Sequence, residues 1–140
     1  MFYLDTSLVV AYYCPELLSE KAETFITVNS PVAVSPLTEL EMFSAVSRKV
    51  REGNLDKNDA TRILAAFLSH LDSQLYTLAP LSDRHYKLAR DWIGLLSNNL
   101  RSLDALHLAL ASAEDMVILT ADQGLAKSAN VLGVSFILVE

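Results

Sequence analysis

The last third of the chain alternates between short apolar runs and one helical stretch. Residues 116–119 form an apolar run that leads to Asp122, and residues 134–139 form a second run. Between them, residues 123–132 place apolar side chains at helical spacing, and Gly133 is the residue type that commonly follows a helix end. A connection of this length is sufficient for a right-handed crossover between parallel strands. This segment therefore predicts a strand–helix–strand unit.

The same alternation extends back to the N-terminus. Further strands are expected at residues 2–4, 31–35 and 75–78. One helix is expected to begin at Asp5-Thr6-Ser7. Two further helices are expected to begin with a proline in the first turn, and three with the N-cap residues Asp56, Ser82 and Ser102. These five helices are expected at residues 15–28, 36–52, 57–71, 83–97 and 102–115, the second of them ending at Gly53-Asn54. Five strands with interposed helices predict an α/β fold: a single domain over residues 1–140, with a mostly parallel five-stranded sheet and helices on both faces.

The composition is that of one ordered domain. Of 140 residues, 51% are hydrophobic and 20% are charged, with only four glycines and four prolines. We see no apolar run of the roughly 18 residues that a membrane span needs, and no secretory signal at the start. The single Cys14 cannot form an internal disulfide. We therefore expect a cytoplasmic protein that does not enter a membrane.

Acidic residues follow several of the expected strands. Ligands of open parallel sheets bind beyond the carboxyl ends of the strands, so these positions indicate the site. Asp5 directly follows the first strand, and Asp122 follows the fourth after a two-residue turn. Glu39 and Glu41 lie in the first turns of the helix after the second strand. Each acid could simply cap a helix, because carboxylates there satisfy free backbone amides.

Asp104 is harder to explain as a cap. It lies in the first turn of a helix whose residues 103–111 are apolar nearly all round, which predicts a buried helix. A carboxylate desolvated alone costs several kcal/mol, so Asp104 should be paired or bind a metal ion. Glu39 and Glu41 lie about 200° apart around their helix, so only one of them can face the same point. The helical pattern alone leaves that choice open.

Four short segments together resemble a known family. They are Leu4-Asp5-Thr6-Ser7, the Ser-Pro-Leu-Thr-Glu-Leu-Glu of residues 35–41, the Leu-Asp-Ala-Leu-His-Leu-Ala of residues 103–109, and Leu119-Thr120-Ala121-Asp122 with the later Gly133-Val134. In this order, and spread over essentially the whole chain, they resemble the PIN-domain family and in particular its VapC-type toxin ribonucleases. No acidic position departs from the family pattern.

The resemblance implies a function and a site. It implies that Asp5, Glu41, Asp104 and Asp122 bind Mg²⁺ or Mn²⁺, and it favours Glu41 over Glu39. It also implies support from the hydroxyl of Thr6 or Ser7, and from Thr120. The implied reaction is endonucleolytic hydrolysis of RNA that leaves 5′-phosphate and 3′-hydroxyl ends. Implied partners are the RNA substrate, a second copy in a homodimer, and a cognate antitoxin that often inserts a basic residue among the carboxylates.

The net charge of −6 is unusual for a nuclease, because basic surfaces bind phosphate. Of 17 acidic residues, 13 remain when the four predicted ligands are set aside, against 11 basic ones. A hard divalent cation would relieve the repulsion among the four. Arg48 and Arg101 are the expected substrate contacts; Lys49, Arg51, Arg84, Lys87 and Arg90 are further basic candidates that could equally be solvated helix faces.

Several alternatives stay open at this stage. The fold could serve a housekeeping RNA-processing nuclease, a DNA-directed nuclease, or a non-catalytic RNA-binding module. An aspartyl-phosphate phosphatase would want a second aspartate where Ser7 stands. His107 is expected to be a packed histidine rather than a ligand, and His70 and His85 are expected at the surface. Some of the apolar residues Tyr12, Tyr13, Leu17, Leu18 and Phe43 could form an exposed patch for a dimer or an antitoxin helix.

Overall fold

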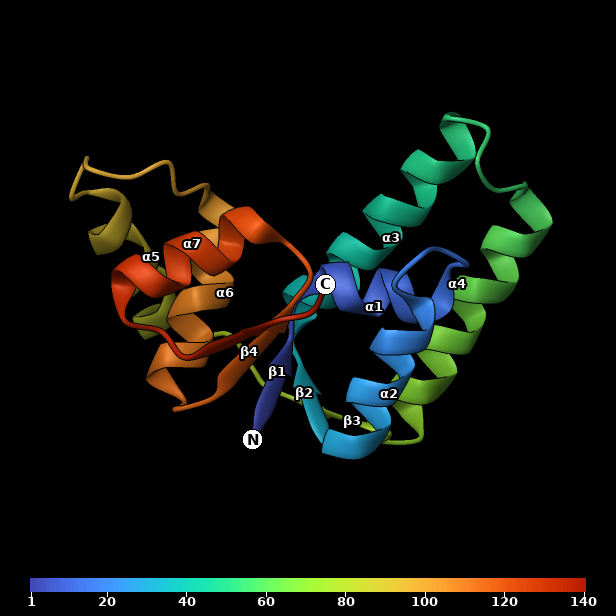
Figure 1. The fold of residues 1–140 in the computed structure, drawn as a ribbon, viewed down its shortest axis with the longest axis horizontal. Helices are drawn as coiled ribbons and strands as arrows, with labels where there is room; N and C mark the ends of the chain where they lie inside the picture. Colours follow the sequence, from blue (N-terminus) through green and yellow to red (C-terminus); the bar gives the residue numbers. More distant parts are fainter.

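A five-stranded parallel sheet forms the centre of the computed structural model, which describes residues 1–140 (Figure 1). Its strands are β1 (Phe2–Leu4), β2 (Val32–Val34), β3 (Tyr76–Leu78), β4 (Val117–Thr120) and β5 (Phe136–Leu138). They lie in the order β3-β2-β1-β4-β5, and every neighbouring pair is parallel. The chain runs outward from β1 to β3 and then crosses back to β4. The strand order therefore changes direction between β1 and β4, which is where such sheets bind ligands.

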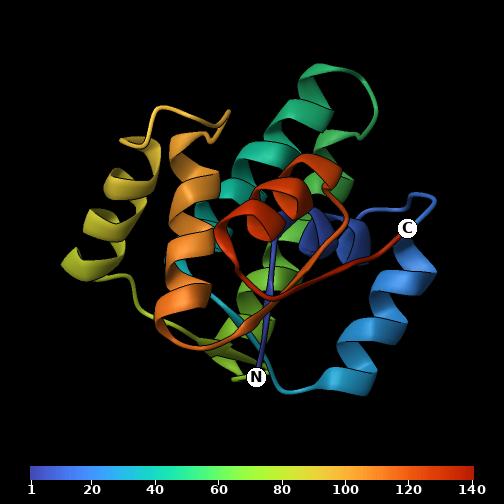
Figure 2. The ribbon, with the colours of Figure 1, turned by 60° about the vertical axis from the view of Figure 1, so that its left-hand side comes forward.

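Seven helices cover the two faces of this sheet (Figures 1 and 2). One layer holds α5 (Asp83–Ile93), α6 (Ser102–Ala113) and α7 (Gln123–Leu132), and the other holds α1 (Thr6–Tyr13), α2 (Ser19–Asn29), α3 (Pro36–Arg51) and α4 (Lys57–Asp72). Successive strand residues point to opposite faces. Tyr3 and Ile118 accordingly belong to the core under α5–α7, whereas Leu4 and Leu119 belong to the core under α1–α4. The predicted α/β fold with five strands is confirmed.

Three predicted helix boundaries are wrong. The second helix begins at Ser19 rather than Pro15, because residues 15–18 form a turn in which Ser19 Oγ accepts a hydrogen bond from the Glu16 amide. Helix α5 ends at Ile93 rather than Ser97, and Leu96 lies in the left-handed region with φ of 60°. The N-cap of α6 is Arg101, and Ser102 is already helical. None of the helices combines the length and the hydropathy that a membrane-spanning segment requires.

His85 is buried, so its expected surface position is wrong. The histidine lies one turn into α5, on the side that packs against α6. Its Nδ1 accepts a hydrogen bond of 3.0 Å from the Ser82 amide, and its Nε2 lies 3.0 Å from Glu114 Oε1 at the end of α6. His70 is half-buried and lies 2.6 Å from the Tyr13 hydroxyl. Both imidazoles link elements that are distant in sequence.

Replacing His85 with Ala should destabilise the protein by about 1–3 kcal/mol, because the packing of the buried imidazole and its contacts with the Ser82 amide and the Glu114 carboxylate are lost. Urea unfolding measures this change. Lys87→Ala, at an exposed position of the same helix, serves as the control and should change the free energy of unfolding by less than about 0.5 kcal/mol. Equal stability of the two variants would contradict a structural role for His85.

Candidate active site

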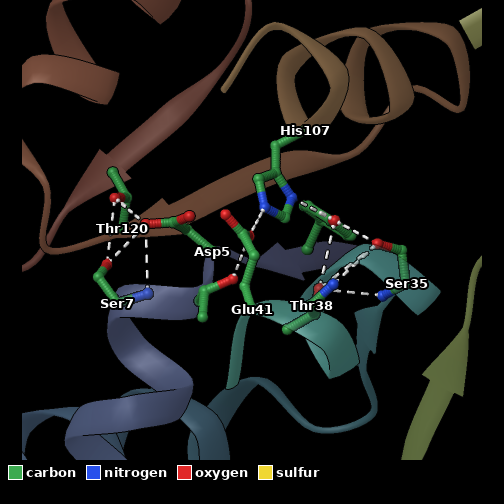
Figure 3. A network of polar contacts seen from close by, with 9 residues as sticks. Asp5, Ser7, Ser35, Thr38, Glu41, His107 and Thr120 are labelled. Atoms are coloured by element: carbon green, nitrogen blue, oxygen red, sulfur yellow. Dashed lines mark hydrogen bonds and ion pairs between the residues drawn. The ribbon is translucent and has the colours of Figure 1, made fainter. Parts of the chain in front are cut away.

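Asp5 lies at the carboxyl end of β1, almost fully buried at 6% exposure. Its Oδ2 accepts hydrogen bonds from Ser7 Oγ at 2.7 Å and from Thr120 Oγ1 at 2.9 Å (Figure 3). Its backbone amide donates to Leu119 O at 2.9 Å, which ties the start of α1 to β4. One carboxylate oxygen is therefore held by the protein, and the other forms no hydrogen bond with it.

The hydroxyls of Ser7 and Thr120 also join the two strand ends to each other. The Ala121 amide donates to Ser7 Oγ at 3.0 Å, and the Asp122 amide donates to Thr120 Oγ1 at 2.9 Å. The two hydroxyl oxygens lie 3.4 Å apart. Both of these predicted supporting residues thus lie against Asp5, and they fix the β1–α1 and β4–α7 junctions side by side.

Glu41 lies in α3 and points toward the same space as Asp5 (Figure 3). Its Oε1 accepts a hydrogen bond from Thr6 Oγ1 at 2.7 Å and a second, short one from His107 Nε2. Burial by itself would raise the pKa of Glu41, but the hydrogen bond and charge of His107, with the Thr6 hydroxyl, lower it below its usual range. Glu41 is therefore held as a carboxylate.

Sequence reasoning missed the network behind Glu41. His107 is buried, as expected, but its Nδ1 lies 2.6 Å from the Tyr3 hydroxyl, and Tyr3 in turn lies 2.8 Å from Ser35 Oγ. Ser35 and Thr38 form the capping box that starts α3. Because a carboxylate only accepts, the proton of the His107–Glu41 hydrogen bond lies on His107 Nε2.

This chain of contacts had only weak signals in the sequence. Ser35-Pro36 marks a helix start, and His107 lies one turn beyond Asp104 on an apolar helix. Neither feature indicates that Tyr3 and Glu41 meet through His107, because the three residues come from β1, α3 and α6. The contact depends on how the two helices pack against the sheet.

Asp122 and Asp104 complete the acidic group. Asp122 is the N-cap of α7, and its Oδ1 accepts from the amides of Gly124 at 2.8 Å and Leu125 at 3.1 Å. Asp104 is half-buried in the first turn of α6 and forms no hydrogen bond. Burial raises the pKa of Asp104, and the negative charges of Asp122, Asp5 and Glu41 raise it further, while His107 opposes them. The four acids are therefore close enough to repel one another.

The four carboxylates are the type of ligand that a hard divalent cation prefers, but their side chains do not surround a single point. Asp5, Glu41 and Asp122 each have one carboxylate oxygen held by the protein and one that is free, and both oxygens of Asp104 are free. Mg²⁺ and Mn²⁺ prefer such oxygen ligands. As the side chains stand, no three of them are arranged to hold one ion, so binding would require side-chain rotation.

The remaining predicted residues lie at different distances from this group. Glu39 is on α3, about 200° around the helix from Glu41, and its carboxylate makes no hydrogen bond. Arg48 is exposed near the end of α3, about 10 Å along the axis from Glu41. Arg101 is exposed and lines a cleft of about 500 Å³ that also has Asp104 and Asp122 in its wall.

Residues 2–131 match the PIN domain family. This chain belongs to the PIN domain family. No curated protein sequence matches it. Among solved structures, this PIN domain superposes on the FitAcB structure from Neisseria gonorrhoeae with a TM-score of 0.72 and 18% identity, covering 98% of this chain and 96% of that one.

Two further structures share the fold. One is VapC20 from Mycobacterium tuberculosis, described as a toxin that cleaves the sarcin–ricin loop, with a TM-score of 0.73, 15% identity and coverage of 91% and 95%. The other is VapBC2 from Rickettsia felis bound to a DNA fragment from their promoter, with a TM-score of 0.70, 19% identity and full coverage of both chains at 100%. At these identities the similarity establishes the fold.

Proposed function

We propose that this PIN domain is a metal-dependent endoribonuclease, the toxin of a toxin–antitoxin pair. The observation that carries the proposal is that Asp5 and Asp122 follow the neighbouring strands β1 and β4 and are joined through the Thr120 hydroxyl, with Glu41 bonded to Thr6 at the start of α1. The raised pKa of Asp104, caused by its burial and by the other three charges, supports a site that needs a cation.

In this proposal the four carboxylates hold Mg²⁺ or Mn²⁺. The bound ion would neutralise their charge, polarise the phosphodiester and lower the pKa of a coordinated water. The protein's own contribution is orientation. Ser7 and Thr120 hold one oxygen of Asp5, and Thr6 and His107 hold one oxygen of Glu41, which leaves the second oxygen of each free for the ion. The α7 amides fix Asp122 in the same way.

The proposed substrate is RNA, cleaved to 5′-phosphate and 3′-hydroxyl ends. The support is the family, together with a relative of the same fold described as a toxin that cleaves the sarcin–ricin loop. Arg101 lies beside Asp104 and Asp122 and is suited to contact phosphate, whereas Arg48 would meet a more distant part of the strand. We place the reaction in the cytoplasm.

The proposed protein partners are a cognate antitoxin and a second copy of this chain. Structures of the same fold include a toxin–antitoxin complex from Klebsiella pneumoniae, with a TM-score of 0.65. Leu17 is fully exposed, while Tyr12, Tyr13, Leu18 and Phe43 are half-buried against the core under α1–α4. A single exposed leucine does not mark an interface, so the support for these partners is the shared fold.

A cleavage assay on total RNA tests the proposal. The wild-type chain should cut RNA with Mn²⁺ and stop when EDTA is added, and Asp5→Ala, checked for folding by circular dichroism, should not cut. Cleavage by the folded Asp5→Ala variant, or cleavage in EDTA, would contradict a metal-dependent site at these residues. Faster cleavage of DNA would favour a DNA-directed nuclease, and RNA binding without turnover would favour a non-catalytic module.

A second assay separates a toxin from a housekeeping enzyme. The product of a small gene found beside the gene for this chain, co-purified with it, should suppress Mn²⁺-dependent cleavage. Full activity of that complex on one structured RNA precursor would instead indicate RNA processing.

A further inference from the structure

A cleft beside the acidic group extends beyond the proposed metal site. Its volume of about 500 Å³ lies within the range of about 300–1,000 Å³ that is usual for small-ligand sites. Asp104 and Asp122 lie in its wall, and the rest of the lining comes from the loop of residues 97–101 and from α7. The cleft therefore opens directly off two of the proposed ligands.

Two cations line this cleft without an acidic partner. Arg101 and Lys127 are both exposed, and they come from different elements, Arg101 from the N-cap of α6 and Lys127 from α7. Neither forms a salt bridge, although two aspartates line the same cleft. Unpaired cations beside a proposed cleavage site are suited to bind the phosphates on either side of it.

The loop of residues 97–101 carries two asparagine side chains, one that is hydrogen-bonded within the protein and one that is not. Asn98 holds the loop: its Nδ2 donates to Trp92 O at 3.2 Å, and its Oδ1 accepts from the Leu100 amide at 3.1 Å. Asn99 is exposed and makes no hydrogen bond, so its donor and acceptor are both available. An amide side chain offers what the edge of a nucleobase needs for hydrogen bonding.

Apolar side chains supply a surface for a base or a ribose. Leu100 and Leu125 are buried in the core and Val131 is 76% exposed, and all three line the cleft. Single-stranded RNA is recognised by unstacked bases that pack on protein side chains while their edges are hydrogen-bonded. The cleft thus combines phosphate-binding, edge-reading and apolar groups within one nucleotide-sized space.

We propose that this cleft binds one unstacked nucleotide of the RNA substrate, next to the phosphodiester that is cleaved. Arg101 and Lys127 contact its phosphate, and Asn99 reads the edge of its base. This inference rests on the proposed function and names the substrate subsite of the same site. It makes the loop of residues 97–101 a determinant of sequence preference.

Binding of a mononucleotide tests the cleft without any cleavage. Adenosine 5′-monophosphate is titrated into the ¹⁵N-labelled chain with Mg²⁺, and the amides of residues 97–101 and 124–132 should shift. Arg101→Gln and Lys127→Gln should each weaken binding about tenfold, whereas Lys57→Gln, an exposed lysine on α4 without a salt bridge, should not. Shifts elsewhere, unchanged binding by Lys127→Gln, or equal binding of inorganic phosphate would overturn the assignment.

Cleavage kinetics on short oligoribonucleotides separate this inference from the proposed function. Arg101→Gln and Lys127→Gln should raise KM about tenfold with little change in kcat. Asn99→Ala should reduce the preference among bases at one position about tenfold, and Asn130→Ala, an exposed asparagine of α7 outside the cleft lining, should not. If KM and base preference are unchanged in these variants, the assignment of the cleft is wrong, but the proposed ribonuclease function is unaffected. If the wild type binds the mononucleotide in the cleft but does not cleave RNA, the cleft assignment holds and the proposed ribonuclease function is wrong.

Discussion

Replacing Asp104 with Asn should abolish RNA cleavage while leaving the metal-free protein as stable as the wild type or more stable. The loss of activity should be at least about 10²- to 10³-fold, which is typical when one charge-stabilising group is removed. The gain in stability follows because Asp104 is half-buried, has no hydrogen-bond donor and faces three other carboxylates that raise its pKa. Asparagine has nearly the same shape and carries no charge.

Thermal unfolding in EDTA and cleavage in Mn²⁺ measure the two effects on the same preparation. Asp72→Asn, which removes an exposed carboxylate of α4 that forms no salt bridge, is the matched control and should change neither cleavage nor Tm. Strong destabilisation of Asp104→Asn together with retained cleavage would contradict the role of Asp104. Added Mn²⁺ should raise the Tm of the wild type more than that of Asp104→Asn.

The same variant should change how stability depends on pH. A carboxyl whose folded-state pKa is raised stabilises the protein fully below its unfolded value of about 4. That contribution is lost as the pH rises through the folded pKa. The stability advantage of Asp104→Asn in EDTA should therefore grow from pH 3.5 toward pH 7. The lowered pKa of Glu41 acts in the opposite direction, but it is present in both proteins and largely cancels from their difference.

Replacing His107 with Leu should reduce cleavage by about 10- to 100-fold, the loss expected when the partner that orients a metal ligand is removed. His107 is a positioning residue: it touches neither the proposed ion nor the substrate, but it donates to Glu41 and is itself oriented by Tyr3. Without it, the pKa of Glu41 should rise, because His107 is the main factor that lowers it.

Mn²⁺ affinity, measured by calorimetry, distinguishes positioning from simple loss of structure. In His107→Leu the affinity should fall by the same factor as the activity, and the pH at which binding is half-maximal should move upward. His107→Gln, which retains a side-chain N–H donor, should recover part of the Mn²⁺ affinity and part of the cleavage activity. An unchanged affinity for Mn²⁺ in a folded His107→Leu protein would show that the histidine only packs.

The fold was largely predictable because its signals are local. Alternating apolar runs define the strands. Asp5 and Asp56 mark helix starts by accepting hydrogen bonds from nearby amides, and Gly133 marks a helix end by donating its own amide to backbone carbonyls. The wrong helix boundaries occur where the same local pattern is compatible with either a helix or a turn. Pro15 is compatible with a first helical turn, but here it precedes a turn before α2. The helical pattern continues past Ile93, although α5 ends there and Leu96 has a left-handed backbone.

The sequence by itself determined the order of strands and helices, and hence that Asp5 and Asp122 follow strands that can lie side by side. Only the tertiary structure decided which side chains meet. Glu41, His107 and Tyr3 are brought together across β1, α3 and α6, and the buried His85 joins the start of α5 to the end of α6. Periodicity reports which face of an element is apolar, whereas a contact between distant residues depends on how those faces pack. The orienting network behind the carboxylates belongs to that second kind of information.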